Sequence, residues 1–469
     1  MGETGELFGE LPEQVGPQRA PSGGAPRLRQ AERCQTAWRM TSLEDLVGSD
    51  HRVRQVWAFA QGLDLAPQLA RIGSVEGRAG HPAADPRLLL ALWLLTTIER
   101  VGSARALARL CVEHHAYRWL SLVGRGDPTA PLGGEVSMNH KSLADFRVAH
   151  GELLKRLLVD GFAALLRAGI ASLERVAQDG MRVRASAGAG SFRRRSTLER
   201  CREVAAARVV ALRAELEADP GASTRRQQAA QQRAARERQE RVDRALAAAA
   251  ALAEARGTAP PADPATDTGP DNDGPSSGAA PRSEPRASTT DAEARVMKMA
   301  DGGFRPAFDV QLVSDTGTGM ILDVEVDNQG TDMGKLAPTN DRLTALYGRR
   351  PGQQLVDGGY TRLACIERLE QQGCQVFAPV PRPRDPQRDR HAPRPGDPPG
   401  VAAWRWRMGT DAASAIYKQR ASTAECANAQ ARNRGLRQFP VRGTVKAKAV
   451  ALWLALAHNM TRIWALQPG

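Results

Sequence analysis

Three acidic residues that lie far apart in the chain could share one metal site. Asp179 occurs in VAQDGMRVRA, an alternating run that places Ala177 and Met181 on the same strand face as the aspartate. A charged carboxylate among apolar neighbours is costly unless it is paired or binds a metal ion. Glu425 is the only acidic residue between Asp411 and the C-terminus, in a segment rich in Arg and Lys. A lone carboxylate in such a cationic segment suggests a ligand for divalent ions that act beside nucleic-acid phosphates.

The third acidic residue, Asp357, directly follows the apolar run QQLV. A helical pattern, TRLACIERLEQQG, and a second apolar run, CQVFAPV, come next, so we expect a strand, a helix and a strand. Asp357 would then lie at the C-terminal end of the first strand, where ligands bind in such sheets. Asp301 in MADGGFRP also precedes two glycines, but it follows a polar linker and fits a surface turn. We therefore prefer Asp357 as the metal ligand.

The composition points to a polyanionic partner. The chain has 469 residues, a formal net charge of +13 and a pI of about 10.1. The excess charge is mostly arginine, whose planar fork suits phosphate, so nucleic acid is the first candidate. No apolar run reaches the roughly 20 residues that span a bilayer, and the N-terminus does not resemble a secretory signal. We expect a cytoplasmic, nucleoid-associated protein with no membrane contact. Its six scattered cysteines, without a C-x-x-C pair, should be reduced and structural.

The elements that must position these carboxylates begin after a loosely ordered arm at 1–40. Residues 41–170 read as several helices: Pro86 suits a first helical turn, Ser103 is a natural N-cap, and Gly102 separates two helices. Short helices that carry Arg and Lys suggest a DNA-reading module. The alternative is a helical scaffold whose charges only solvate its surface.

From residue 171 the pattern changes to strands. FDVQLVSD and MILDVEVD are joined by the turn residues DTGTG and predict a hairpin. Asp323, Glu325 and Asp327 alternate with apolar residues, so we expect them on the solvated face of a strand. Residues 195–256 should form long helices, broken near 219–221, followed by a disordered stretch that together make an insertion over 195–295. Trp404 and Trp406 are expected to pack in the core.

This order of elements resembles the ribonuclease H-like core of DDE transposases. More closely, the chain is similar to bacterial insertion-sequence transposases whose last motif carries Tyr, Arg, Glu and Lys at set spacing. Tyr417 and Arg420 precede Glu425, and Arg432 stands where the family usually has lysine. Four residues separate Arg420 from Glu425, whereas the signature has three. At about 3.6 residues per turn, Glu425 and Arg432 should share a helical face and Arg420 should be rotated away. HPAADPRLLLALWLLTTIERVGSARALARL and NHKSLADFRVAH also look like the helical domain that precedes the core in these transposases.

The resemblance implies an α/β fold and a metal-dependent enzyme. A helical DNA-binding domain at 41–170 would precede a ribonuclease H-like domain at 171–469, interrupted by the 195–295 insertion. The enzyme would bind the ends of its mobile element, cleave them and transfer them to target DNA. Asp179, Asp357 and Glu425 would hold Mg²⁺, for which Mn²⁺ can substitute, and Tyr417, Arg420 and Arg432 would contact DNA.

The implied partners are double-stranded DNA with terminal inverted repeats and target DNA, bound by a homodimer or a higher oligomer. Two alternatives remain open at this point. One is a DNA-binding protein derived from a transposase with a decayed catalytic core, and the other is a structural protein dimerised by the helices of 195–256.

Overall fold

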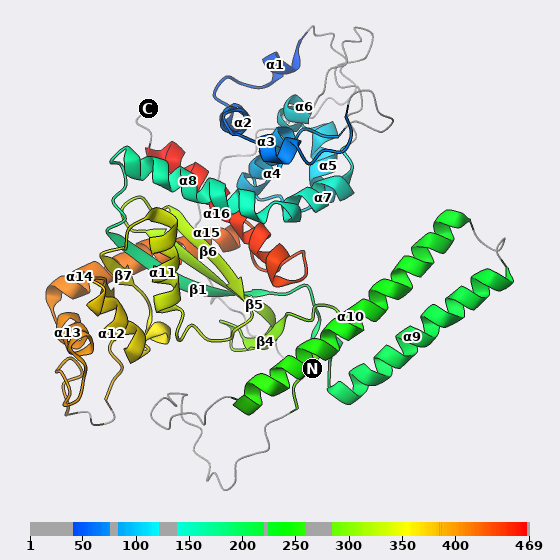
Figure 1. Cartoon of the computed structure of the whole chain (residues 1–469). Coiled ribbons are helices and arrows are strands. Elements are labelled where there is room, and N and C mark those ends of the chain that lie inside the picture. The colour runs from blue at the N-terminus through cyan, green and yellow to red at the C-terminus, as the bar shows by residue number, and fades with distance from the viewer. Residues whose placement is uncertain are drawn as a thin grey trace, which may run out of the picture. The chain divides into compact units, whose positions relative to one another are not determined.

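In the described residues up to 167 the regular structure is helical, and a mixed sheet with further helices follows (Figure 1). The computed structural model describes residues 41–75, 83–121, 138–219, 224–258, 284–383, 385 and 387–466. The arm predicted at 1–40 and most of the stretch predicted to be disordered, 259–283, lie outside the described residues. The fold is mixed α/β, as expected.

The N-terminal helices pack around one apolar helix, α4. Asp85 caps α4, Pro86 is its first residue, and nearly every side chain of α4 is buried. The Ser103 side chain accepts a hydrogen bond from the backbone of Ala106 and caps α5, so the expected helix starts are confirmed. The Trp93 Nε1 donates to Leu143 O at 2.9 Å and ties α4 to α7. The helices are α1 (Leu43–Leu46), α2 (Arg52–Gln61), α3 (Ala66–Leu69), α4 (Pro86–Ile98), α5 (Ala104–Glu113), α6 (His115–Ser121), α7 (His140–Ala149) and α8 (Gly151–Arg167).

The sheet is centred on two long neighbouring strands, β1 and β5, which pair antiparallel. On one side, β1 pairs parallel with β7, and β7 pairs parallel with β8. On the other side, β4 and β6 pair antiparallel with successive parts of β5. The hairpin of β5 and β6 and the strand, helix, strand unit around Asp357 are confirmed. The strands are β1 (Arg175–Arg184), β4 (Arg295–Lys298), β5 (Phe304–Asp315), β6 (Ile321–Asp327), β7 (Gln353–Leu355) and β8 (Gln375–Phe377).

Helices cover both faces of this sheet. One face packs against α11 (Leu336–Tyr347) and α12 (Leu363–Gln371), and α13 (Pro399–Met408) packs on α12. The other face packs against α15 (Cys426–Asn433) and α16 (Thr444–Leu466), which follow α14 (Asp411–Arg420). The long α16 also packs on α4, α7 and α8, so one apolar core joins the N-terminal helices to the sheet.

The expectation that the acids of β6 are surface residues is wrong. Asp323 is buried and pairs with Arg342 Nε of α11 at 2.9 Å. Glu325 pairs with Lys448 Nζ of α16, also at 2.9 Å, and Asp327 pairs with Lys335. The strand alternates as expected, but the helices beside it supply cations, and the acids are neutralised internally instead of being solvated.

The insertion after β1 is a helical hairpin, as predicted, made of α9 (Arg195–Ala218) and α10 (Arg225–Thr258) (Figure 1). At its base, η1 (Ala189–Ser191) leads into β2 (Phe192–Arg193), which pairs with β3 (Ala287–Ser288). A small apolar cluster contributed by α9, α10 and β3 fixes the hairpin to this base; it consists of Leu198, Ala245, Ala249 and Ala287.

The two tryptophans of α13 differ in burial. Trp404 is fully buried and its Nε1 donates to Ala378 O at 3.2 Å, as expected for core packing. Trp406 is 67% exposed, so its predicted core position is wrong. Residues two positions apart on a helix point about 200° away from each other, so Trp404 and Trp406 cannot both face one core.

Cys34 is outside the described residues, and the five cysteines within them are free thiols. No helix in the described part of the chain is long and apolar enough to cross a membrane.

Candidate active site

Asp179 lies in the middle of β1, on the face that packs against α15. Its neighbour on that face, Met181, belongs to the apolar core, and the Asp179 side chain is only 14% exposed. Burial raises the pKa of this carboxyl, and the charge of Arg420 partly opposes the shift. Asp179 Oδ2 accepts a hydrogen bond from Asn428 Nδ2 at 2.9 Å. The strand therefore presents a carboxylate that is costly to ionise unless a cation stays beside it.

Asp357 follows β7 at its C-terminal end, one strand away from Asp179. Its Oδ1 accepts the backbone N–H of Gly359 at 2.8 Å and caps the short helix η2 (Gly358–Tyr360). Its other oxygen faces Arg420 Nη2 at 3.9 Å. Because β1 and β7 are parallel neighbours, the end of β7 brings Asp357 to the region of Asp179.

Arg420 joins the three predicted carboxylates. Its Nη2 lies 2.9 Å from Asp179 Oδ1, and its Nη1 lies 2.8 Å from Glu425 Oε1. With Asp357 at 3.9 Å, one guanidinium is in contact with all three acids. The Arg420 side chain is 11% exposed, whereas that of Glu425 is 55% exposed. The arrangement is a half-buried cluster of three negative charges around one positive charge.

A local distortion of the helix places Arg420 there. Residues Ala421–Glu425 form a π-helical turn between α14 and α15. A π-helix bonds residue i to i+5, so it puts residues five apart on one side, and such turns are frequent at functional sites. The expectation that Arg420 is rotated away from Glu425 is therefore wrong. The wider turn absorbs the extra residue between them.

Asn428 completes the cluster and was not anticipated from the sequence. It is 4% exposed, and its Oδ1, like Arg420 Nε, is buried without a hydrogen-bond partner among the described residues. Its position three residues after Glu425 on a helix was the available signal, because residues three apart share a side. Tyr417 is half-buried against an apolar cluster that includes Ala177, and burial raises its pKa. Arg432 is exposed on α15.

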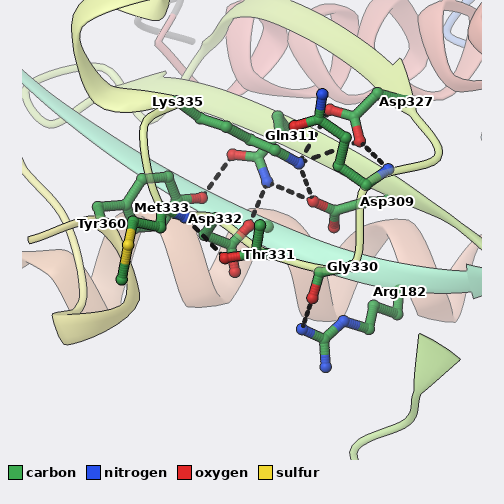
Figure 2. A network of polar contacts seen from close by, with 12 residues as sticks. Arg182, Asp309, Gln311, Asp327, Gly330, Thr331, Asp332, Met333, Lys335 and Tyr360 are labelled. Carbon is green, nitrogen blue, oxygen red and sulfur yellow. Dashed lines mark hydrogen bonds and ion pairs between the residues drawn. The ribbon is translucent and has the colours of Figure 1, made fainter. Parts of the chain in front are cut away.

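A second polar network lies on the opposite face of the sheet (Figure 2). Gln311 Nε2 donates to Asp309 at 2.8 Å and to Asp332 at 2.6 Å, and Tyr360 donates to Gln311 Oε1 at 2.5 Å. Lys335 forms ion pairs with both Asp309 and Asp327. Burial, followed by the charge of Asp332, raises the pKa of Asp309 to about 6. The network fixes the loop after β6 onto the sheet.

Gly180 lets that network approach β1 beside Asp179. A Cβ at this position would lie 2.4 Å from Gln311 Nε2 and 2.6 Å from Asp332 Oδ1, closer than real Cβ contacts allow. Only glycine fits between the network and the strand. The side chains of Gln311 and Asp332 therefore pack directly against the backbone next to Asp179, on the opposite face of the sheet.

The rival residue Asp301 lies in a different setting. It is exposed in the turn between β4 and β5, where it accepts from the backbone of Gly303 at 3.2 Å and pairs with Arg305 at 2.5 Å. The expectation that Asp301 belongs to a surface turn is confirmed.

The oxygen atoms around Arg420 are suitable ligands for a hard divalent cation. Carboxylate and amide oxygens are the ligands that Mg²⁺ and Mn²⁺ take, and the cluster offers three carboxylates and the unpartnered Asn428 Oδ1. Within the described residues, no three Asp, Glu, His or Cys side chains converge closely enough to form a metal site by themselves. The guanidinium of Arg420 lies in the space between the acids instead.

Two family models match separate parts of the chain. A model described as "Transposase DDE domain" matches residues 400–464, the segment from α13 to α16 that contains Arg420, Glu425 and Asn428. A model described as "Transposase domain (DUF772)" matches residues 41–147, the helices from α1 to α7. Together the two matches indicate an insertion-sequence DDE transposase. These matches do not test the Tyr, Arg, Glu and Lys signature of the transposase, which stays a prediction. No curated protein and no solved structure matches the chain.

Proposed function

We propose that this transposase binds the ends of its mobile element and catalyses metal-dependent DNA cleavage and strand transfer at Asp179, Asp357 and Glu425. One observation carries the proposal. Acidic residues chosen from three separate sequence contexts meet at one guanidinium, on a strand, a strand end and a distorted helix. The known order of these elements in the family supports the same assignment.

The topology supports a ribonuclease H-like core. The strand order β6, β5, β1, β7, β8 begins with an antiparallel hairpin and continues with parallel strands, and the acids lie on the central strand and at the end of its parallel neighbour. The helices α1 to α8 would then serve the recognition of element ends, and the enzyme would act as a dimer or a higher oligomer on DNA.

The chemistry needs little from the protein beyond positioned oxygens. In cleavage, water attacks the phosphorus and the P–O3′ bond breaks, leaving a 3′ hydroxyl and a 5′ phosphate. In joining, that hydroxyl attacks a target phosphodiester in the same way. When bound, Mg²⁺ activates the attacking oxygen and stabilises the leaving one. Asp179, Asp357 and Glu425 would hold the ions, and Asn428 fixes the Asp179 carboxylate by its hydrogen bond.

The basic side chains have a separate part. Arg432 is exposed on the helix that follows Glu425, where it can contact a DNA phosphate. Arg420 offsets part of the negative charge of the three acids. With an ion held by the carboxylates, Arg420 would be free to contact a phosphate, and Tyr417 would contact the DNA backbone beside it.

The test uses isosteric variants that remove charge but keep shape. We expect Asp179→Asn, Asp357→Asn and Glu425→Gln each to abolish cleavage of end DNA and joining of pre-cleaved ends, while binding of end DNA stays within about threefold of wild type. Asp301→Asn is the matched control and should remain active, because Asp301 lies in an exposed turn. Strand-resolved gels give cleavage and joining, and a filter-binding assay gives affinity. Cleavage by either aspartate variant would remove the assignment.

A further inference from the structure

A cleft lies between the helical insertion and the catalytic core. It has a volume of about 610 Å³ and lies between α10, the segment that precedes β4, and the start of α16. Five of its lining side chains are basic and three are acidic; the basic ones are Arg241, Arg244, Arg295, Arg442 and Lys446. The insertion and the core each contribute cations to this cleft, so neither part makes it alone.

Two of the three acidic side chains already accept hydrogen bonds from backbone N–H groups. Asp291 Oδ2 accepts the N–H of Gly443 at 3.1 Å, and Glu293 Oε2 accepts the N–H of Thr444 at 2.9 Å. These carboxylates cap the start of α16, a structural use that also reduces their influence on the cleft. The third acid, Glu237, is exposed one helical turn before Arg241 on α10.

Arg295 Nη1 and Arg244 Nε also donate to backbone carbonyls. The other three basic side chains have no such use within the described residues. Arg442 and Lys446 are exposed, and Arg241 is half-buried. Because these cations line a cleft that an extended anion could enter, the charge of the cleft favours a ligand with regularly spaced negative groups. A nucleic-acid backbone has that chemistry.

The cleft is connected to the active site by the strand register. Asp179 lies opposite Leu312, and Arg184 lies opposite Ala307, which in turn lies opposite Arg295. Five residues along a strand and two strand spacings separate Asp179 from Arg295, which corresponds to about 20 Å. A second connection runs along the chain, because exposed arginines follow Glu425 at 432, 437 and 442. Exposed arginines therefore occur along the chain between Glu425 and the cleft.

We propose that this cleft binds the phosphate backbone of the element end about six base pairs from the cleaved bond, so that the insertion serves as a clamp on the DNA. The distance follows from 20 Å at about 3.4 Å per base pair. The proposal rests on the proposed function, since it assumes that the DNA passes the carboxylates. It assigns a role to the α9–α10 hairpin that the catalytic residues do not explain.

The experiment uses the full chain with Arg241→Gln, Arg442→Gln and Lys446→Gln combined. Each lost phosphate contact should reduce the slope of log affinity against log salt by about 0.9, so the triple variant should have a slope shallower by about 2.7. The affinity for end duplex and for a random duplex of the same length should fall by the same factor, since backbone contacts carry no sequence information. Hydroxyl-radical protection about six base pairs from the cleaved bond should disappear.

The matched control is Arg236→Gln, an exposed arginine of α10 that is outside the cleft and about 140° around the helix from Arg241. It should reduce the slope by less than 0.5. An unchanged slope and an unchanged footprint in the triple variant, with wild-type thermal unfolding, would overturn the clamp while wild-type cleavage of end DNA upholds the proposed function. Wild-type protein that fails to cleave its end DNA would instead overturn the proposed function itself.

Discussion

Replacing Arg420 by Gln should lower the stability of the transposase in the absence of metal. The Arg420 and Asp179 side chains are 11% and 14% exposed, and breaking a buried ion pair by removing one partner costs about 3–5 kcal/mol. The pair with Glu425 adds at most about 1 kcal/mol, because that carboxylate is 55% exposed. The raised pKa of Asp179 lets it take up a proton and limits the loss. We expect the free energy of unfolding to fall by about 3 kcal/mol at pH 7 in EDTA.

The same change should strengthen metal binding. A divalent ion that binds among the carboxylates must displace the guanidinium, so part of the ion-pair energy opposes binding in the wild type. If about half of the 3 kcal/mol is lost in that displacement, the affinity of Arg420→Gln for Mn²⁺ should rise about tenfold. The two effects have opposite signs, which a merely disrupted fold would not produce.

Urea unfolding in EDTA gives the stability, and calorimetric titration of the DNA-free protein with Mn²⁺ gives the affinity. Lys418→Gln, an exposed cation two residues earlier on α14, is the control and should change neither quantity. Weaker Mn²⁺ binding by Arg420→Gln, or stability equal to that of the wild type, would refute the idea that Arg420 occupies the place of the ion.

Two further variants probe the network behind β1. Gly180→Ala should destabilise the protein by about 1–3 kcal/mol in urea unfolding, because the new methyl would lie 2.4 Å from Gln311 Nε2, whereas Gly188→Ala, with open space around it, should be neutral. Equal effects of the two alanines would contradict the close approach. Asp309→Asn removes a carboxyl whose folded pKa is raised to about 6, mainly by burial. The folded state binds that proton more tightly, so wild-type stability from this group falls as the pH rises from about 4 to 6, and the variant should lack the fall. Asp301→Asn should keep it, and parallel profiles for wild type and Asp309→Asn would exclude this contribution.

Periodic patterns gave correct expectations for much of the fold. Strict alternation with turn residues between the runs identified the β5–β6 hairpin, because a half-apolar strand has a period of two whatever surrounds it. The position of Asp357 at a strand end followed from the same reasoning. Alternation could not tell a solvated face from one neutralised by neighbouring helices, so the environment of Asp323 was misjudged.

The candidate site was less accessible to sequence reasoning. An ideal helical period placed Arg420 away from Glu425, and a single π-turn reversed that conclusion. One added residue rotates every following side chain unless the helix widens locally, and the sequence does not say which occurs. Asn428 carries no charge and no recognisable pattern, so its contact with Asp179 became visible only in the fold.

The central place of β1 in the sheet has a consequence for synthesis of the chain. Gln178 on β1 contacts Gln311 on β5, 133 residues later, and Gln354 on β7, 176 residues later. At about 5–20 residues per second, a ribosome needs roughly 7–27 s after making β1 to supply even its first partner strand. Throughout that interval a half-apolar strand has two unpaired edges, and unpaired strand edges promote aggregation. Because Asn428 contacts Asp179 across 249 positions of the chain, the candidate site can assemble only after that further length has been synthesised.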